Sequence, residues 1–194
     1  MASRAGLGLV AALAAAVGLV AAGCGGGSSK AEPPKLVSKT FTSVGDSYVR
    51  STEPHGNFGK NTELRIDATP PVRAYIQFMP FGIQGRIKRA TLKVFPLSTS
   101  TDGFQVRSVS GPWSESRLTF ENAPAVGRVI NLSGVLSKGV SRSIDVTSLV
   151  RSPESTVGLA LVALGPTEIA VASRERGGRG PRLVIESSRP AGTS

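Results

Sequence analysis

The chain has 194 residues, of which 40% are hydrophobic and 5% aromatic, and its formal net charge is +10. This length fits one domain preceded by a targeting segment. A basic balance favours polyanionic partners, but the aromatic residues are too few for a surface that stacks bases. We therefore expect an arginine-rich, solvated surface and no nucleic-acid partner.

The first 23 residues have the pattern of an export signal. Arg4 precedes an unbroken run of Ala, Leu, Val and Gly, which corresponds to a charged n-region and an apolar h-region. Cys24 is the only cysteine, and Val20-Ala21-Ala22-Gly23-Cys24 resembles a bacterial lipobox with Ala21 in place of the usual leucine. We expect residues 1–23 to be a lipoprotein signal peptide and Cys24 to be lipidated, which anchors an exported protein to the extracytoplasmic face of the cell membrane.

Two other interpretations of this segment remain open. The apolar run nearly reaches the roughly 20 residues that span a bilayer, so it can be an uncleaved membrane anchor. It can also be an ordinary signal peptide in which Cys24 is incidental.

Residues 24–39 predict a flexible linker, because GGGSS follows Cys24 and Glu32-Pro33-Pro34 comes shortly after. The remaining chain contains no cysteine, so no disulfide stabilises it. An exported domain at residues 40–187 must therefore depend on a hydrophobic core. Residues 188–194 are expected to be a disordered tail.

Short segments of alternating polarity recur along residues 40–187, with Gly, Pro and Asn between them. Residues 157–164 are instead a nearly continuous apolar run, which is typical of a strand buried on both faces. The predicted strands are residues 41–50, 63–67, 73–78, 90–94, 104–109, 129–132, 143–146, 157–164, 168–172 and 183–186. One helical turn is expected at residues 145–150, capped by Asp145 or Thr147. This pattern predicts an all-β fold, a single jelly-roll-like β-sandwich of about ten strands.

Gly45-Asp46-Ser47 matches a short motif that positions the nucleophilic serine of one group of esterases. A serine hydroxyl needs a positioned histidine as its base, and His55 is the only histidine of the chain. It lies in a Pro-His-Gly loop eight residues downstream, without the late Asp-x-x-His segment of that esterase group. We therefore predict no catalytic residue and no enzyme. A polysaccharide hydrolase with paired carboxylates, or an ester hydrolase that uses Ser47, is the least favoured alternative.

A zinc site is excluded by the lack of clustered His and Cys residues. Calcium needs several converging oxygens, and Asp46, Glu53, Asp67 and Glu175 are candidates, although no spacing selects among them. No cofactor is expected apart from a structural calcium ion, for which Asp46 is retained as a candidate ligand.

A series of non-catalytic segments carries a resemblance to a known family. The segments are Asp46-Ser47-Tyr48-Val49 with Gly56-Asn57-Phe58-Gly59 and Leu64-Arg65-Ile66, residues 73–78, residues 87–94, Trp113-Ser114-Glu115 with Leu118-Thr119-Phe120 and Asn122-Ala123-Pro124, Asp145-Val146-Thr147 with Leu149-Val150, Ser173-Arg174-Glu175, and residues 181–185. In this order they closely resemble the DNRLRE-type domain, which is similar to carbohydrate-binding module family ninety-six, over residues 41–186. Phe120 departs from the second tryptophan of many members, and Met79-Pro80 departs from a more usual acidic residue.

The resemblance implies a β-sandwich of jelly-roll type found on exported and surface proteins, often beside enzymes. Some relatives bind acidic polysaccharide such as alginate. For such a ligand the candidate residues are Arg86, Lys88, Arg89, Lys93 and Arg107, because a guanidinium group matches a carboxylate bidentately. A solvated strand face is the alternative interpretation of these residues.

Trp113 is a candidate sugar platform, and a cap over the edge of the core is the alternative that we favour for it. Phe58 and Tyr75 leave the same two interpretations open. We also expect Arg73 or Arg174 to form an inner ion pair with Glu175 at one end of the sandwich, because buried charge is tolerated only when paired.

Taken together, the sequence predicts a monomeric, cell-surface lipoprotein. Its expected partner is an envelope or extracellular polysaccharide, which it would bind as a carbohydrate-binding or adhesion module. A structural surface domain that binds a protein partner is the alternative.

Overall fold

The structure is a computed structural model that describes residues 35–150 and 156–189. The predicted signal peptide, Cys24 and most of the predicted linker lie outside the described residues. Within the described ranges, no helix has both the length and the apolar character needed to cross a membrane.

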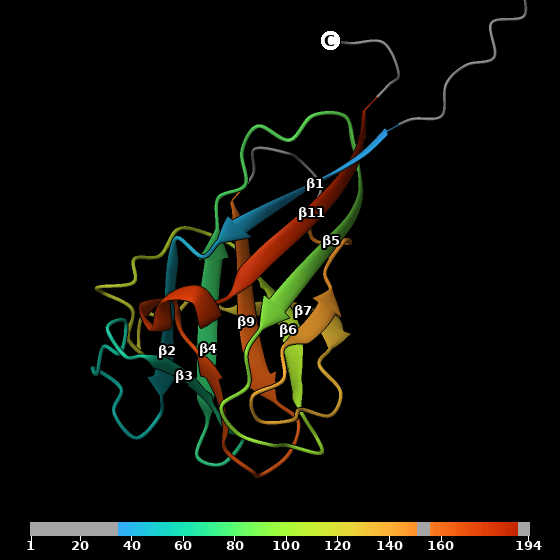
Figure 1. Cartoon of the computed structure of the whole chain (residues 1–194). Coiled ribbons are helices and arrows are strands. Elements are labelled where there is room, and N and C mark those ends of the chain that lie inside the picture. Colours follow the sequence, from blue (N-terminus) through green and yellow to red (C-terminus); the bar gives the residue numbers. More distant parts are fainter. Residues whose placement is uncertain (1–34, 151–155, 190–194) are drawn as a thin grey trace, which may run out of the picture. The chain divides into compact units, whose positions relative to one another are not determined.

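The regular structure is almost entirely β-strand, as the alternation of polarity predicts (Figure 1). The strands are β1 (Lys35–Thr42), β2 (Gly45–Arg50), β3 (Glu63–Ile66), β4 (Val72–Phe78), β5 (Arg86–Val94), β6 (Phe104–Val109), β7 (Val126–Leu132), β8 (Arg142–Asp145), β9 (Val157–Ala163), β10 (Ile169–Ala172) and β11 (Arg182–Arg189), and a short 3-10 helix, η1 (Arg174–Arg179), precedes β11.

The strands form two main antiparallel sheets, in the order β1-β11-β5-β8 and in the order β2-β4-β9-β6-β7, and β10 pairs with β3 in a small third sheet. We call the first the outer sheet and the second the inner sheet. Apart from β2 at one edge, the two orders are those of an eight-stranded jelly roll. The predicted fold class is confirmed.

The main core lies between the outer and inner sheets. Leu92 of β5 and Ile185 of β11 belong to the same buried cluster as Ile76 of β4 and Leu159 of β9. Alternate residues of each strand enter this cluster because successive side chains point to opposite faces of a sheet. The other face of the outer sheet is thereby left to solvent.

A second, smaller core covers the far face of the inner sheet. Ala160 of β9 and Tyr75 of β4 pack there with Leu118 and, partly buried, Trp113. The last two residues belong to the segment between β6 and β7, which we call the covering loop (residues 110–125). This loop explains why β9 is an almost continuous apolar run, since both of its faces are buried.

The structure differs from the predicted boundaries at both ends of the domain. β1 begins at Lys35, inside the predicted linker, and β11 continues to Arg189, inside the predicted tail. The two strands pair antiparallel along their whole length, from Lys35 opposite Arg189 onward. The side chains of β1 are mostly polar and exposed, so the sequence shows no alternation of apolar and polar residues there. The strand is defined by its backbone pairing with β11 rather than by burial.

Two local elements also differ from expectation. Residues 41–50 are not one strand, since the chain breaks at Ser43 and Val44 between β1 and β2. Residues 174–179, which lie between the predicted strands 168–172 and 183–186, form the short helix η1. The turn at residues 145–150 is present, and Asp145 Oδ1 accepts a hydrogen bond of 2.8 Å from the Thr147 amide.

Candidate functional site

The exposed face of the outer sheet is almost entirely polar. The strand register shows which of its residues lie side by side in a row across the four strands. One row contains Thr42, Arg182, Lys93 and Ser143, and the next contains Thr40, Val184, Thr91 and Asp145. Glu186 and Arg89 are opposite one another in a third row. Short hydroxyl side chains and long charged ones therefore alternate across the face.

Lys93 and Arg182 are directly opposite one another on neighbouring strands. Like charges in this position destabilise a sheet, and no acidic side chain pairs with either of them in the described part of the chain. The Arg182 guanidinium is held against η1 by a hydrogen bond of 2.6 Å from Nη2 to the Gly178 carbonyl oxygen. The result is a fixed, uncompensated positive charge on an open sheet face.

In the third row, by contrast, the positive charge has acidic neighbours. Arg89 is opposite Glu186, and its positive charge also helps to hold the pKa of Asp145 below the usual range. The main cause of that lowered pKa is the hydrogen bonding of Asp145 to Thr147. The positive charge that remains available to a ligand is thus concentrated at Lys93 and Arg182.

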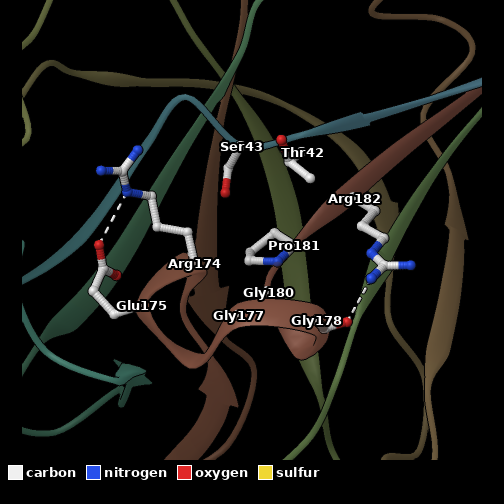
Figure 2. A pocket seen from close by; sticks show the side chains of 9 residues that line it. All are labelled: Thr42, Ser43, Arg174, Glu175, Gly177, Gly178, Gly180, Pro181 and Arg182. Carbon is white, nitrogen blue, oxygen red and sulfur yellow. Dashed lines mark hydrogen bonds and ion pairs between the residues drawn. The ribbon is translucent and has the colours of Figure 1, made fainter.

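Two hollows occupy this face. One of about 580 Å³ is lined by Thr42, Ser43, Arg174, Glu175, Gly177, Gly178, Gly180, Pro181 and Arg182. Figure 2 shows Arg182 on one side of it and Arg174 with Glu175 on the other. A second of about 380 Å³ is lined by Arg89, Thr91, Lys93, Ser143, Asp145, Val184 and Glu186. Arg182 of the first hollow and Lys93 of the second are cross-strand neighbours, and we call the two hollows together the sheet groove.

The profile of one known family, carbohydrate-binding module family 96, matches residues 37–187. The chain belongs to this family. The match runs from within β1 to within β11 and so covers the whole sandwich, as the sequence resemblance predicted. A comparison with curated proteins finds no match. The chain is therefore a carbohydrate-binding module, a class that is generally non-catalytic.

The six residues predicted to contact a ligand do not come together in this family 96 module. Arg89 and Lys93 project into the sheet groove. Lys88 lies at a bulge, where Arg89 pairs with Glu186 but Ile87 pairs with Ser187. Arg86 is at the far end of the same strand, opposite Ser188.

The remaining two candidates belong to the inner sheet side of the module. Arg107 is on β6, and its Nε donates a hydrogen bond of 2.9 Å to the Gly127 carbonyl oxygen. Trp113 lies in the covering loop and is edge-on to Tyr75, with ring centroids 6.2 Å apart. Its half-buried ring, packed on the second core, fits the predicted cap rather than an open sugar platform.

The other two aromatic candidates are also engaged within the fold. Tyr75 is fully buried, and its hydroxyl donates a hydrogen bond of 3.0 Å to the Pro124 carbonyl oxygen. Phe58 stacks on Tyr48 with ring centroids 4.4 Å apart. Neither ring is free to stack on a sugar.

Sequence reasoning missed Arg182. The alternation in Pro181-Arg182-Leu183-Val184-Ile185 places Arg182 on the face opposite to the core, and this signal is present in the sequence. The sequence does not show that Arg182 lies beside Lys93, because this depends on the pairing of β11 with β5.

Arg174 pairs with two acidic side chains at the end of the sheet groove. Its Nε is 3.0 Å from Glu175 Oε1 and 3.1 Å from Glu115 Oε1. Its side chain is 40% exposed, so the pair is a surface one and not the inner pair that was expected. Arg73 is elsewhere, with its guanidinium carbon 5.0 Å from the centroid of the Phe120 ring.

The esterase motif does not form a catalytic arrangement. Ser47 is fully buried in β2, and its hydroxyl donates to the Tyr48 carbonyl oxygen at 3.3 Å. His55 is an exposed loop residue whose Nδ1 is 3.0 Å from Glu121 Oε2. Of the calcium candidates, Asp46 and Glu175 come together, joined by Glu115, whereas Glu53 pairs with Arg50 and Asp67 caps a turn at Thr69.

Proposed function

We propose that this family 96 module binds acidic polysaccharide in the sheet groove, with Lys93 and Arg182 receiving a sugar carboxylate. The observation that carries the proposal is the directly opposed pair of cations, which have no acidic partner among residues 35–150 and 156–189. A bound carboxylate would turn their mutual repulsion into two charge-assisted hydrogen bonds, which are among the strongest in proteins.

The surroundings of the pair suit a sugar chain. Thr42, Thr91 and Ser143 flank the cations in the same or the next row, and their hydroxyls can donate to and accept from sugar hydroxyl groups. The groove lies open on the sheet, so a polymer can enter from the side and extend beyond it. The net charge of +10 would also speed the approach of a polyanion.

Affinity electrophoresis and calorimetry at low salt, with a polyuronate, test this function. We expect saturable binding that weakens as salt is raised and that falls by roughly tenfold in Lys93→Ala or Arg182→Ala, the effect of losing about 1.5 kcal/mol of charge-assisted bonding. Lys60→Ala, an exposed cation that lines neither hollow, is the matched control. Absence of binding to any acidic polysaccharide at low salt would exclude this function.

We further propose that the module is exported and held at the membrane through a lipid on Cys24. The support is the apolar run that ends at Cys24 and the Gly- and Ser-rich segment that follows it. Such a tether would leave the sheet groove free to meet polysaccharide outside the cell. Cell fractionation tests the anchor, because Cys24→Ser should move the protein out of the membrane fraction.

A structural surface domain that binds a protein is the second candidate. It is favoured by an exposed apolar hollow of about 450 Å³ that includes Phe81, Met79 and Val44, of which Phe81 is 71% exposed. A glycan array separates the two functions. If no glycan, acidic ones included, is bound at low salt, the protein-binding function is the one that remains.

A further inference from the structure

Three carboxylates from distant parts of the chain converge beside the sheet groove. Asp46 comes from β2, Glu115 from the covering loop and Glu175 from η1. One carboxylate oxygen of each lies within 4.8 Å of those of the other two. We call this arrangement the acidic cluster.

Asp46 is the buried member of the cluster, with only 1% of its surface exposed. Its Oδ2 accepts hydrogen bonds from the Ser43 hydroxyl at 3.1 Å and from the Arg174 amide at 3.0 Å. Its Oδ1 is buried without any partner among the described residues. A buried carboxylate oxygen without a partner is costly, and this one belongs to a side chain that faces two further carboxylates.

The positive charge at the cluster does not balance its negative charge. Arg174 Nε is shared by Glu115 Oε1 and Glu175 Oε1, and no other cationic side chain pairs with the three carboxylates in the described ranges. The Oε2 atoms of Glu115 and Glu175 have no hydrogen-bond or ion-pair partner among the described residues. The buried Asp46 carboxyl and its two acidic neighbours thus share one guanidinium group, an arrangement whose excess negative charge a bound cation would balance.

Glu115 is held in position by the backbone around it. Its carbonyl oxygen accepts a hydrogen bond of 2.7 Å from Asn57 Nδ2, and its Oε1 accepts one of 2.9 Å from the Asp46 amide. Gly59 packs so closely that a Cβ atom there would lie 2.6 Å from the Glu115 carbonyl oxygen. The cluster is therefore a built arrangement rather than a chance meeting of mobile surface acids.

We propose that Asp46, Glu115 and Glu175 bind a calcium ion. Calcium takes six to eight oxygen ligands in flexible geometry at about 2.4 Å, so oxygens that share one ion lie up to about 4.8 Å apart. Magnesium requires a tighter octahedron, and zinc prefers nitrogen and sulfur ligands, which the cluster does not offer. Water and nearby carbonyl oxygens complete the shell.

The ion has a structural consequence for the sheet groove. It joins the covering loop and η1 to β2, and Glu175 and the neighbouring Arg174 form one wall of the hollow in Figure 2. Calcium therefore fixes that wall, although the ion itself is separate from Lys93 and Arg182. The acidic cluster can be tested without any polysaccharide.

Terbium luminescence offers a direct assay, because Tb³⁺ occupies calcium sites and is excited by a nearby indole. Trp113, the only tryptophan, reaches within 3.9 Å of the position of a Cβ atom on Gly45, the neighbour of Asp46. Titration of the chelator-treated full chain with Tb³⁺ should give a saturable signal that Ca²⁺ displaces. Ca²⁺ should also raise the melting temperature, with one ion bound per chain by calorimetry.

Variants identify the ligands. Glu115→Gln and Glu175→Gln should each weaken Ca²⁺ binding by about tenfold or more, whereas Glu121→Gln, an exposed acid in the same covering loop, should leave it unchanged. If wild-type protein shows neither saturable Tb³⁺ luminescence nor a Ca²⁺-dependent melting temperature, Arg174 is the only cation of the cluster and the proposal is wrong. That wild-type result decides the matter even if a variant fails to fold. The proposal would also be overturned if folded Glu115→Gln and Glu175→Gln bound Ca²⁺ with the same affinity as wild type.

Discussion

Lys93 on β5 and Arg182 on β11 are paired directly across two antiparallel strands, and both point to the exposed side of the outer sheet. Most sheets avoid like charges in such a pair because of their mutual repulsion. Here the repulsion is retained in the middle of a groove, and its cost to stability is what a ligand carboxylate would relieve.

Replacement of Lys93 should therefore separate stability from binding. Lys93→Thr is expected to raise the free energy of unfolding by about 0.2–1 kcal/mol and, at the same time, to lower the affinity for a polyuronate by roughly tenfold. Urea denaturation without ligand measures the first effect and calorimetry the second. Lys60→Thr is the control and should change neither. A Lys93→Thr variant that is less stable than wild type would mean that the pair is not repulsive in the folded state.

Much of the fold could be predicted from the sequence, because a strand with one buried face alternates apolar and polar residues. Ala90, Leu92 and Val94 alternate with polar residues and do enter the core. β1 carries no such signal, since all its side chains are exposed or partly so. Its existence depends on backbone pairing with β11, which is a relationship between residues about 145 positions apart in the printed sequence.

The candidate site was harder to predict for the same reason. Arg89 and Lys93 could be assigned to an exposed strand face from their spacing alone. Arg182 joins them only through strand register, and Asp46, Glu115 and Glu175 meet only after the covering loop and η1 have folded onto β2. Residue types thus indicated which side chains bear charge, whereas tertiary pairing decided which of them act together.

The buried carboxyl of Asp46 should make stability depend on pH. Its pKa is raised from 3.8 to about 7, chiefly by burial and further by the charges of Glu175 and Glu115. Below pH 4 both folded and unfolded chains hold the proton, and between pH 4 and pH 7 only the folded chain keeps it. The free energy of unfolding should therefore fall as pH rises through this range, by up to roughly 4 kcal/mol.

Asp46→Asn isolates this effect because the amide does not titrate and Arg174, Glu115 and Glu175 remain around it. In chelator, denaturation series from pH 4 to pH 8 should show the decline in wild type and a flatter curve in the variant. The rest of the sequence is identical in the two proteins, so the difference between their curves reports the Asp46 carboxyl. Parallel curves would mean that Asp46 is ionised throughout this range.

The hydroxyl of Tyr75 attaches the covering loop to the inner sheet through its bond to the Pro124 carbonyl oxygen. Tyr75→Phe keeps the buried ring and removes only this bond, so the free energy of unfolding should fall by about 1 kcal/mol. Hydrogen exchange should accelerate in residues 110–125 more than in β9. Uniform acceleration throughout the domain would show that the loop does not open on its own.

Gly59 determines the position of Glu115 by close approach of the backbone. A Cβ atom at residue 59 would lie 2.6 Å from the Glu115 carbonyl oxygen and 2.7 Å from its Cγ, so Gly59→Ala must displace that residue. We expect a loss of about 1–3 kcal/mol in stability together with weaker Ca²⁺ binding in the terbium assay. Gly178→Ala is the matched control, because its nearest neighbour is the flexible end of Arg182 at 3.8 Å. If Gly59→Ala is destabilised but binds Ca²⁺ as tightly as wild type, the backbone at residue 59 supports the fold without positioning the acidic cluster.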